Sequence, residues 1–237
     1  MNVNEVPRIA APLMLAAAIL LSARHQAVSQ PIELQAGEAP VPSLAETLGA
    51  FEQALAPGAP GYDRGSTRAA VTVIEFADFG CRYCARFAAE TYPALAGEFV
   101  KTGRVRWRYV PFVLGMFPNG DEAARAGTCA AEQGPAAFGR MHDRLFEEQN
   151  AWTSAGDAVG AFASLAHGAG LDVARFATCY VSEATAARVT AANGLAERMA
   201  VRSTPTFFVN GNRVEGALPV EQFRTVLLDA LQQSHHN

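Results

Sequence analysis

The chain has 237 residues, half of them hydrophobic, so it can bury a sizeable core without disulfides as a substitute. Its formal net charge of −4 argues against nucleic acid as a partner, because such proteins need a basic surface. Its four cysteines are too few for a disulfide-scaffold protein. They are enough for one redox pair and one structural bridge.

The N-terminus carries an apolar run from Ile9 to Ala23. The run is shorter than the roughly 20 residues of a membrane span and is typical of the apolar part of a secretory signal. We therefore predict that residues 1–29 are a signal peptide or, where they are not cut, a membrane anchor that is the chain's contact with the membrane. Export predicts a periplasmic or secreted protein in an oxidising compartment, where disulfides persist.

Residues 30–66 are predicted to form a proline-containing linker and one amphipathic helix. Ser43 and Glu46 form a capping-box pattern at the start of that helix. An apolar stripe at helical spacing predicts that the helix docks on the rest of the chain, and it consists of Leu44, Leu48, Phe51 and Leu55. The segment from Pro57 to Gly65 is predicted to be a turn-rich connection.

The stretch from Val71 to Phe87 begins as an apolar, β-branched run that is typical of a buried strand. A turn at Gly80 follows, and then Cys81 and Cys84 stand at the start of a segment with helical spacing. This helix is expected to continue to about Lys101, with a kink or break at Pro93. Its inward residues are expected to be Phe87, Leu95 and Phe99.

A second strand is predicted from Arg104 to Pro111. Its three arginines, at positions 104, 106 and 108, share one face, which we interpret as solvated or salt-bridged in preference to an anion site. Only helices are expected between residues 120 and 200, one of them with Asp172 as its N-cap and with Leu171 and Phe176 as a hydrophobic staple.

The β pattern returns at the C-terminal end. A strand is predicted from Thr206 to Val209, followed by an Asn210-Gly211 hairpin turn, a return strand at residues 213–215 and a helix from about Pro219. The expected inward residues of that helix are Phe223, Leu227 and Leu231. The element order predicts an α/β fold with an all-helical insertion: residues 67–111 plus 201–237 form the α/β domain, and residues 112–200 form the insertion.

Two cysteines separated by two residues at a helix start are typical of a thiol–disulfide redox site. Cys81 is the expected nucleophile, because free backbone N–H groups and the helix dipole at an N-terminus favour a thiolate. Cys84, one turn further in, is the expected resolving thiol. Arg82 lies beside the pair and is expected to favour the thiolate further, which makes the disulfide more oxidising.

Glu75 lies between apolar neighbours on the first strand, where burying a carboxylate is costly. One interpretation is a proton acceptor for Cys84 during exchange, and we favour it. The other is an outward-facing charge on an edge strand.

The cysteine pair alone is also compatible with half of a zinc site. A structural zinc site needs a second such pair or two close histidines. Cys129 and Cys179 are far apart in the sequence, and the five histidines have no matching spacing. We therefore expect no metal and no other cofactor.

The segments FADFGCRYC, ending at Cys84, and TPTFFVNGN, from Thr204 to Asn212, together resemble the DsbA-type family of thiol:disulfide oxidoreductases. The resemblance covers about residues 68–233. It implies a thioredoxin fold interrupted by a helical domain, with Cys81 and Cys84 as the active site and Glu75 as the buried acid behind Cys84. It also implies that Pro205 is cis and faces the cysteines, and that Thr204 pairs with the backbone of a substrate.

The chain departs from the best-known oxidases of that family, which have Pro-His between the cysteines where this chain has Arg82 and Tyr83. These two residues tune the redox potential. The departure therefore leaves the direction of the reaction open.

The remaining cysteines, Cys129 and Cys179, form an even pair in the predicted helical block. In an exported protein such a pair indicates a structural disulfide, and relatives that have both cysteines commonly form one. The alternative is two buried free cysteines that act as small apolar residues.

The function predicted from the sequence is an exported protein-disulfide oxidoreductase. It exchanges a Cys81–Cys84 disulfide with cysteines of exported substrate proteins, in the direction that introduces disulfides, and the family implies reoxidation by a membrane redox partner. One alternative uses the same site as a reductase or isomerase. Another is a non-catalytic peptide-binding or chaperone module that uses a groove near Pro205.

Overall fold

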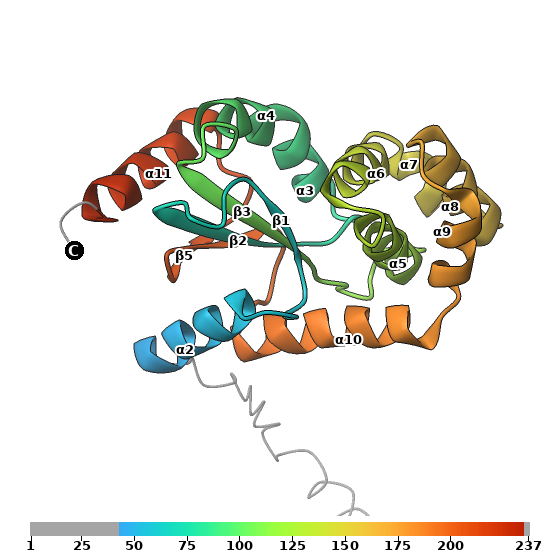
Figure 1. Cartoon of the computed structure of the whole chain (residues 1–237), viewed down its shortest axis with the longest axis horizontal. Helices are drawn as coiled ribbons and strands as arrows, with labels where there is room; N and C mark the ends of the chain where they lie inside the picture. Colours follow the sequence, from blue (N-terminus) through green and yellow to red (C-terminus); the bar gives the residue numbers. More distant parts are fainter. Residues whose placement is uncertain (1–42, 235–237) are drawn as a thin grey trace, which may run out of the picture. The chain divides into compact units, whose positions relative to one another are not determined.

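The computed structural model describes residues 43–234, which contain a five-stranded mixed sheet (Figure 1). The strand order is β1-β3-β2-β4-β5, and β2 pairs parallel with β3 and antiparallel with β4. The strands are β1 (Tyr62–Arg64), β2 (Val71–Ala77), β3 (Val105–Pro111), β4 (Thr206–Val209) and β5 (Asn212–Glu215). Asn210 and Gly211 both have positive φ in the predicted hairpin turn between β4 and β5, which such two-residue turns require.

Helices cover both faces of the sheet. Alternate residues of β2 point to opposite sides, and both sides are apolar, so each face needs a layer of helices to bury it. Val71 and Val73 pack against the helices on one face, and Ile74 and Phe76 pack against those on the other. The first face is covered by α3 (Arg82–Arg86), η1 (Phe87–Thr91), α4 (Tyr92–Leu95), η2 (Ala96–Val100) and α11 (Val220–Ser234) (Figure 1). The second face is covered by α2 (Leu44–Leu55) and α10 (Glu183–Arg198).

The predicted helical block is confirmed, and its core is continuous with the ends of β2 and β3 and with both cysteines of the pair. Asp172 is the N-cap of α9, and both staple residues, Leu171 and Phe176, are buried. The architecture is therefore a thioredoxin fold with a helical insertion, as predicted. The helices between β3 and α10 are α5 (Gly120–Ala131), α6 (Pro135–Glu147), α7 (Gln149–Thr153), α8 (Ala158–Gly168) and α9 (Val173–Tyr180).

The segment after the cysteines is not one regular α-helix. It alternates α and π turns from Arg82 to Val100, and Pro93 lies in the first turn of α4. The backbone N–H of Tyr92 bonds to the carbonyl of Phe87, five residues back, in the π turn just before the proline. A proline removes one helical N–H and crowds the preceding turn. The kink or break predicted at Pro93 therefore takes the form of π turns in this segment. The three predicted inward residues are all buried.

Strand β1 was not predicted, because it lies in the segment interpreted as a turn-rich connection. It pairs antiparallel with β3, so the sheet begins at Tyr62, before the predicted domain start at residue 67. Asp63 on this strand binds Arg106 at 2.8 Å and Arg108 at 3.4 Å. The interpretation of the β3 arginines as a salt-bridged face is therefore confirmed for these two, and Arg104 lies over the ring of Phe99.

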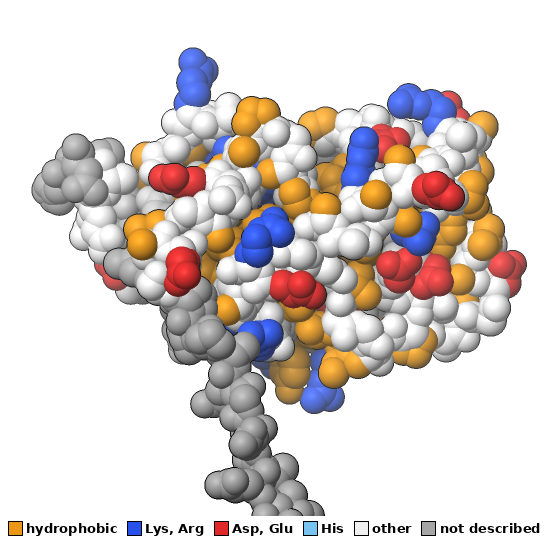
Figure 2. Space-filling model, turned by 90° about the horizontal axis from the view of Figure 1, so that it is seen from below, with side chains coloured by type: hydrophobic (Ala, Val, Ile, Leu, Met, Phe, Trp, Pro, Cys, Tyr) orange, Lys and Arg blue, Asp and Glu red, His pale blue; other side chains and the backbone are white. Residues whose placement is uncertain are grey.

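Helix α2 has the predicted capping box, in which the Ser43 and Glu46 side chains each bond to the other's backbone N–H. It docks on α10, as expected, through Ala50, Phe51 and Ala54. The prediction that Leu48 faces inward is wrong, because its side chain is 42% exposed. On the side of the molecule where α2 and α10 lie, acidic and basic side chains are scattered among other surface residues (Figure 2).

The predicted signal or anchor at residues 1–29 and the linker up to residue 42 lie outside the described residues. Within residues 43–234, no helix has the length and apolar character needed to cross a membrane.

Candidate active site

The two cysteines lie where β2 gives way to α3. Cys81 is the N-cap of α3 and Cys84 is in its first turn, as predicted, and both thiols are free and buried. The carboxylate of Asp78 shapes the preceding turn, since it accepts bonds of 2.8 Å from the backbone N–H groups of Gly80 and Leu114. Gly80 is required here, because a Cβ would lie 2.3 Å from the Cβ of Phe117.

Cys81 is set up to be a thiolate. Hydrogen bonding from Cys84, from the Thr204 side chain and from the backbone N–H groups of Cys84 and Tyr83 lowers the pKa of Cys81 to about 5, although burial opposes this shift. The backbone contribution is the predicted effect of a helix N-terminus. At neutral pH, Cys81 is therefore ionised in the dithiol form.

Cys84 has the opposite character. Burial raises the pKa of Cys84 well above its usual range, and the hydrogen bond to Cys81 and the negative charge of Cys81 raise it further. The pair therefore holds one ready nucleophile and one protonated thiol, and the second thiol needs a proton acceptor before it can react.

Glu75 lies inside the protein on the central strand β2. Glu75 is only 4% exposed, and β2 is not an edge strand. The alternative interpretation of Glu75 as an outward-facing charge on an edge strand is therefore wrong. The indole Nε1 of Trp107 donates a 2.7 Å hydrogen bond to Oε2 of Glu75. Burial raises the pKa of Glu75 to about 7, while this hydrogen bond and the charge of Arg64 oppose the shift. A carboxyl with a pKa near neutrality can both accept and return a proton at physiological pH.

The loop before β4 reaches the cysteines from the far end of the chain. The Thr204–Pro205 peptide bond is cis, as the resemblance implied. The Thr204 carbonyl oxygen lies 3.4 Å from the Cys81 sulfur, and it accepts a hydrogen bond from Cys81 when that residue is in its thiol form. The hydroxyl of Thr204 is buried and has no other hydrogen-bond partner among residues 43–234, so it is free to donate to the Cys81 thiolate, whose pKa it lowers.

Arg82 and Tyr83 lie on the exposed side of the pair. The Arg82 guanidinium lies over the Tyr83 ring, 4.9 Å from its centre, and donates to the Tyr83 hydroxyl at 3.1 Å. Arg86 lies over the same ring at 5.2 Å. The expected direct support of the Cys81 thiolate by Arg82 is thus replaced by stacking on Tyr83, and the groups that lower the pKa of Cys81 are those named above.

Sequence reasoning missed several residues near Glu75. Trp107 lies in the predicted second strand, but its bond to Glu75 depends on the parallel register of β2 and β3, in which Val73 pairs with Trp107. Arg64 comes from the unpredicted strand β1. His142 comes from α6. It is buried there, but the sequence does not indicate that this helical position faces the site.

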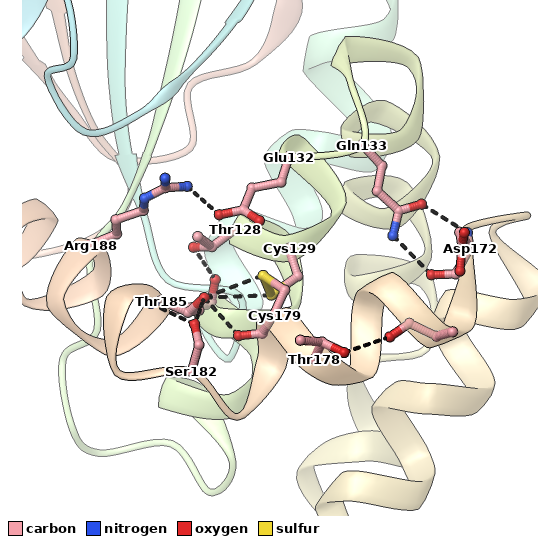
Figure 3. Close-up of a disulfide and its surroundings, with 12 residues drawn as sticks. Thr128, Cys129, Glu132, Gln133, Asp172, Thr178, Cys179, Ser182, Thr185 and Arg188 are labelled. Atoms are coloured by element: carbon pink, nitrogen blue, oxygen red, sulfur yellow. Dashed lines mark hydrogen bonds and ion pairs between the residues drawn. A yellow bond between two sulfur atoms is a disulfide. The ribbon is translucent and has the colours of Figure 1, made fainter.

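Cys129 and Cys179 form a disulfide between α5 and α9, which confirms the predicted bridge (Figure 3). Their Cα atoms are 5.7 Å apart, well within the normal range. The Thr185 hydroxyl at the start of α10 donates to the carbonyl of Cys179 at 2.8 Å. The disulfide therefore joins α5 and α9, and the Thr185 hydrogen bond links α10 to them.

Comparisons with known proteins agree with this geometry. A family model described as thioredoxin matches residues 60–229. The chain is 34% identical over 204 residues to the Na(+)/H(+) antiporter NhaA 3 of Salinispora tropica, covering 83% of this chain but only 29% of the antiporter. It is 24% identical to disulfide bond formation protein D of Bacillus subtilis, over 69% of this chain and 73% of that protein.

Among solved structures, oxidised BdbD from Bacillus subtilis is similar to this chain with a TM-score of 0.66 and 23% identity. The match covers 73% of this chain and 93% of BdbD. The predicted resemblance to the DsbA type is thereby confirmed.

Proposed function

The chain belongs to the thioredoxin family, and from this premise we propose that it is an exported thiol:disulfide oxidoreductase that introduces disulfides into substrate proteins. The observation that carries the proposal is the contrast within the pair: the pKa of Cys81 is lowered to about 5, while that of Cys84 is raised. A pair of this kind separates the two roles that disulfide exchange requires, a stable thiolate and a protonated resolving thiol.

The reaction starts from the Cys81–Cys84 disulfide. A substrate thiolate attacks the Sγ of Cys81 and forms a mixed disulfide, and the Sγ of Cys84 leaves and takes a proton from Glu75. A second substrate thiolate then attacks the substrate sulfur of the mixed disulfide and releases Cys81 as a thiolate. The substrate dithiol loses two electrons and the enzyme disulfide gains them.

The direction follows from the stability of the product. A Cys81 thiolate with a pKa of about 5 stabilises the dithiol form, and a disulfide whose reduced form is stabilised is a stronger oxidant. The Cys81 thiolate is stabilised here without Pro-His between the cysteines. It favours oxidation over the reductase or isomerase alternative.

Substrate contact is proposed at the loop before β4. The Thr204 carbonyl lies 3.4 Å from the Cys81 sulfur, so a substrate strand at this loop brings its cysteine to Cys81. The substrates are cysteine-containing exported proteins, and a membrane redox partner reoxidises the dithiol. The proposed location is the periplasm or the cell exterior, with residues 1–29 as the export signal or anchor.

Two measurements test the proposal. Equilibration of the pair with glutathione buffers gives the potential directly: a value near −120 mV supports an oxidase, and one near −270 mV supports a reductase. The oxidation of a reduced two-cysteine protein is measured in parallel, with Cys81→Ser expected to reduce the rate to background. Retained oxidation by Cys81→Ser would falsify the assignment.

The peptide-binding alternative is tested in cells. A Cys81→Ser, Cys84→Ser double variant leaves the Pro205 loop in place but removes both thiols. If cells that carry this variant in place of the wild type show no loss of function, the protein acts by binding peptides and not by thiol–disulfide exchange.

A further inference from the structure

A small cavity lies beside Glu75, the buried carboxyl of the candidate site. Its volume is about 10 Å³, about the space of one water molecule. Five elements of the fold contribute polar or titratable side chains to its wall, namely Arg64 (β1), Glu75 (β2), Tyr92 (α4), Trp107 and Tyr109 (β3) and His142 (α6).

A much larger pocket of about 840 Å³ lies on the outer side of this cavity. Arg64, Ala88 and Tyr92 line both spaces. Arg64 and Tyr92 therefore stand between the buried carboxyl of Glu75 and a pocket that is open to solvent.

Contacts on several sides hold the Arg64 guanidinium in this wall. It lies 5.2 Å from the centre of the Tyr92 ring and 5.6 Å from that of Phe138. It also donates to the Gly139 carbonyl at 3.4 Å and lies 3.5 Å from the carboxylate of Asp143. Since the side chain is only 21% exposed, its charge is poorly screened by water.

We propose that Arg64 is a positioning residue for disulfide exchange, whose charge at the cavity wall favours the carboxylate form of Glu75, which accepts the proton of Cys84 when the enzyme disulfide is re-formed. This inference rests on the proposed function. When Cys84 attacks a mixed disulfide at Cys81, its thiol proton passes to Glu75, its sulfur bonds to Cys81, and the bound thiol leaves as a thiolate. A protonated Glu75 cannot take that proton.

The other groups that face the cavity do not replace this cation. Burial lowers the pKa of His142 to about 4, so its imidazole is neutral at pH 7. Burial raises the pKa values of Tyr92 and Tyr109, so these two groups are neutral too. Among the described residues that line the cavity, Arg64 thus carries the positive charge at pH 7, and its charge lowers the pKa of Glu75 against burial.

The test separates the two thiol steps. The reduced protein is mixed with an aromatic disulfide that releases a coloured thiolate, once when Cys81 attacks and once when Cys84 closes the enzyme disulfide. The rate of each release is measured from pH 5 to pH 9 for the wild type, Arg64→Met and Arg64→Lys. Arg104→Met is the matched control, because Arg104 also stacks on a ring, that of Phe99, but lines neither space.

We expect Arg64→Met to move the midpoint of the second release by about one pH unit to higher pH and to leave the first release unchanged. Arg64→Lys and Arg104→Met should keep the wild-type midpoint. In a Glu75→Gln background, Arg64→Met should have no further effect on the second release, whereas a purely structural role of Arg64 would persist there. If Arg64→Met does not fold, Arg64→Gln takes its place.

An unshifted midpoint in Arg64→Met, or an equal shift with Glu75→Gln present, overturns the inference. Failure of the proposed function looks different. If the pair does not carry out exchange, the wild type itself shows no second release, and if the direction is wrong, the glutathione equilibrium shows it while both releases remain.

Discussion

Trp107 donates its indole N–H to the carboxyl of Glu75 at 2.7 Å, between two parallel strands in the middle of the sheet. This bond explains how a carboxyl can lie in an otherwise apolar layer, because one of its oxygens has a strong buried donor. It also opposes the effect of burial on the pKa of Glu75, which otherwise rises. Trp107 therefore contributes both to the core and to the chemistry of the site.

Trp107→Phe should keep most of the aromatic packing and remove this bond. We expect the pKa of Glu75 to rise above about 7 and the protein to lose about 1–3 kcal/mol of stability, the usual effect of a lost bond to a buried charged group. Urea unfolding measures the stability, and the pH profile of Cys84 ring closure measures the pKa.

Trp152→Phe is the matched control, since Trp152 is also buried and donates to the Leu145 carbonyl at 2.7 Å, inside the helical insertion. It should cost a similar stability without moving the pH profile. An unchanged profile in Trp107→Phe would contradict the link between this bond and Glu75.

Cys84→Ser should trap the exchange reaction halfway. Cys81 keeps its nucleophilic thiolate, but no thiol remains to displace the bound partner, so mixed disulfides should accumulate at Cys81. Non-reducing electrophoresis and peptide mass spectrometry measure them. Cys81→Ser is the control and should trap far less, because burial keeps Cys84 protonated. Equal trapping by the two variants would mean that the nucleophile is misassigned.

The Cys81 thiolate should make the dithiol form more stable relative to the disulfide form as the pH rises. The folded pKa of about 5 lies below the usual thiol value of about 8.5, so the stabilisation is complete above the unfolded pKa and is lost as the pH falls through 5. Thiolate absorbance should titrate with a midpoint near 5. The difference in unfolding free energy between the dithiol and disulfide forms should grow from pH 5 to about pH 8.5, and a flat difference would contradict the thiolate.

The sequence predicted the elements whose signals are local. The apolar, β-branched run from Val71 to Phe76, the Asn210-Gly211 turn and the Asp172 cap each depend on a few neighbouring residues, and all three match the structure. Strand β1 escaped because its three residues lie between Gly61 and Gly65 and acquire strand geometry only by pairing with β3.

Only the part of the candidate site that depends on neighbouring residues in the sequence was predictable. Cys81, Cys84 and Glu75 belong to one continuous stretch, but the polar groups that line the cavity beside Glu75 come from other elements. Finding Trp107 required the register of β3, finding Arg64 required β1, and finding His142 required the packing of α6 on the sheet. The stacking of Arg82 on Tyr83 likewise depends on the rotamers of the two side chains, which the spacing of the residues in the sequence does not predict.

The disulfide between Cys129 and Cys179 should act on stability and leave the redox pair unchanged. It closes a loop with a sequence separation of 50, for which the loss of chain entropy in the unfolded state corresponds to about 4 kcal/mol. We expect the Cys129→Ala, Cys179→Ala variant to lose about that much, or roughly 10 °C in melting temperature for a protein of this size. The rate at which Cys81 reacts with an aromatic disulfide should stay within twofold of the wild type, because the bridge lies between α5 and α9. Melting curves and that rate, measured on the same samples, check both expectations. A stable variant with a slowed Cys81 would mean that the bridge acts on the active site and not on the fold.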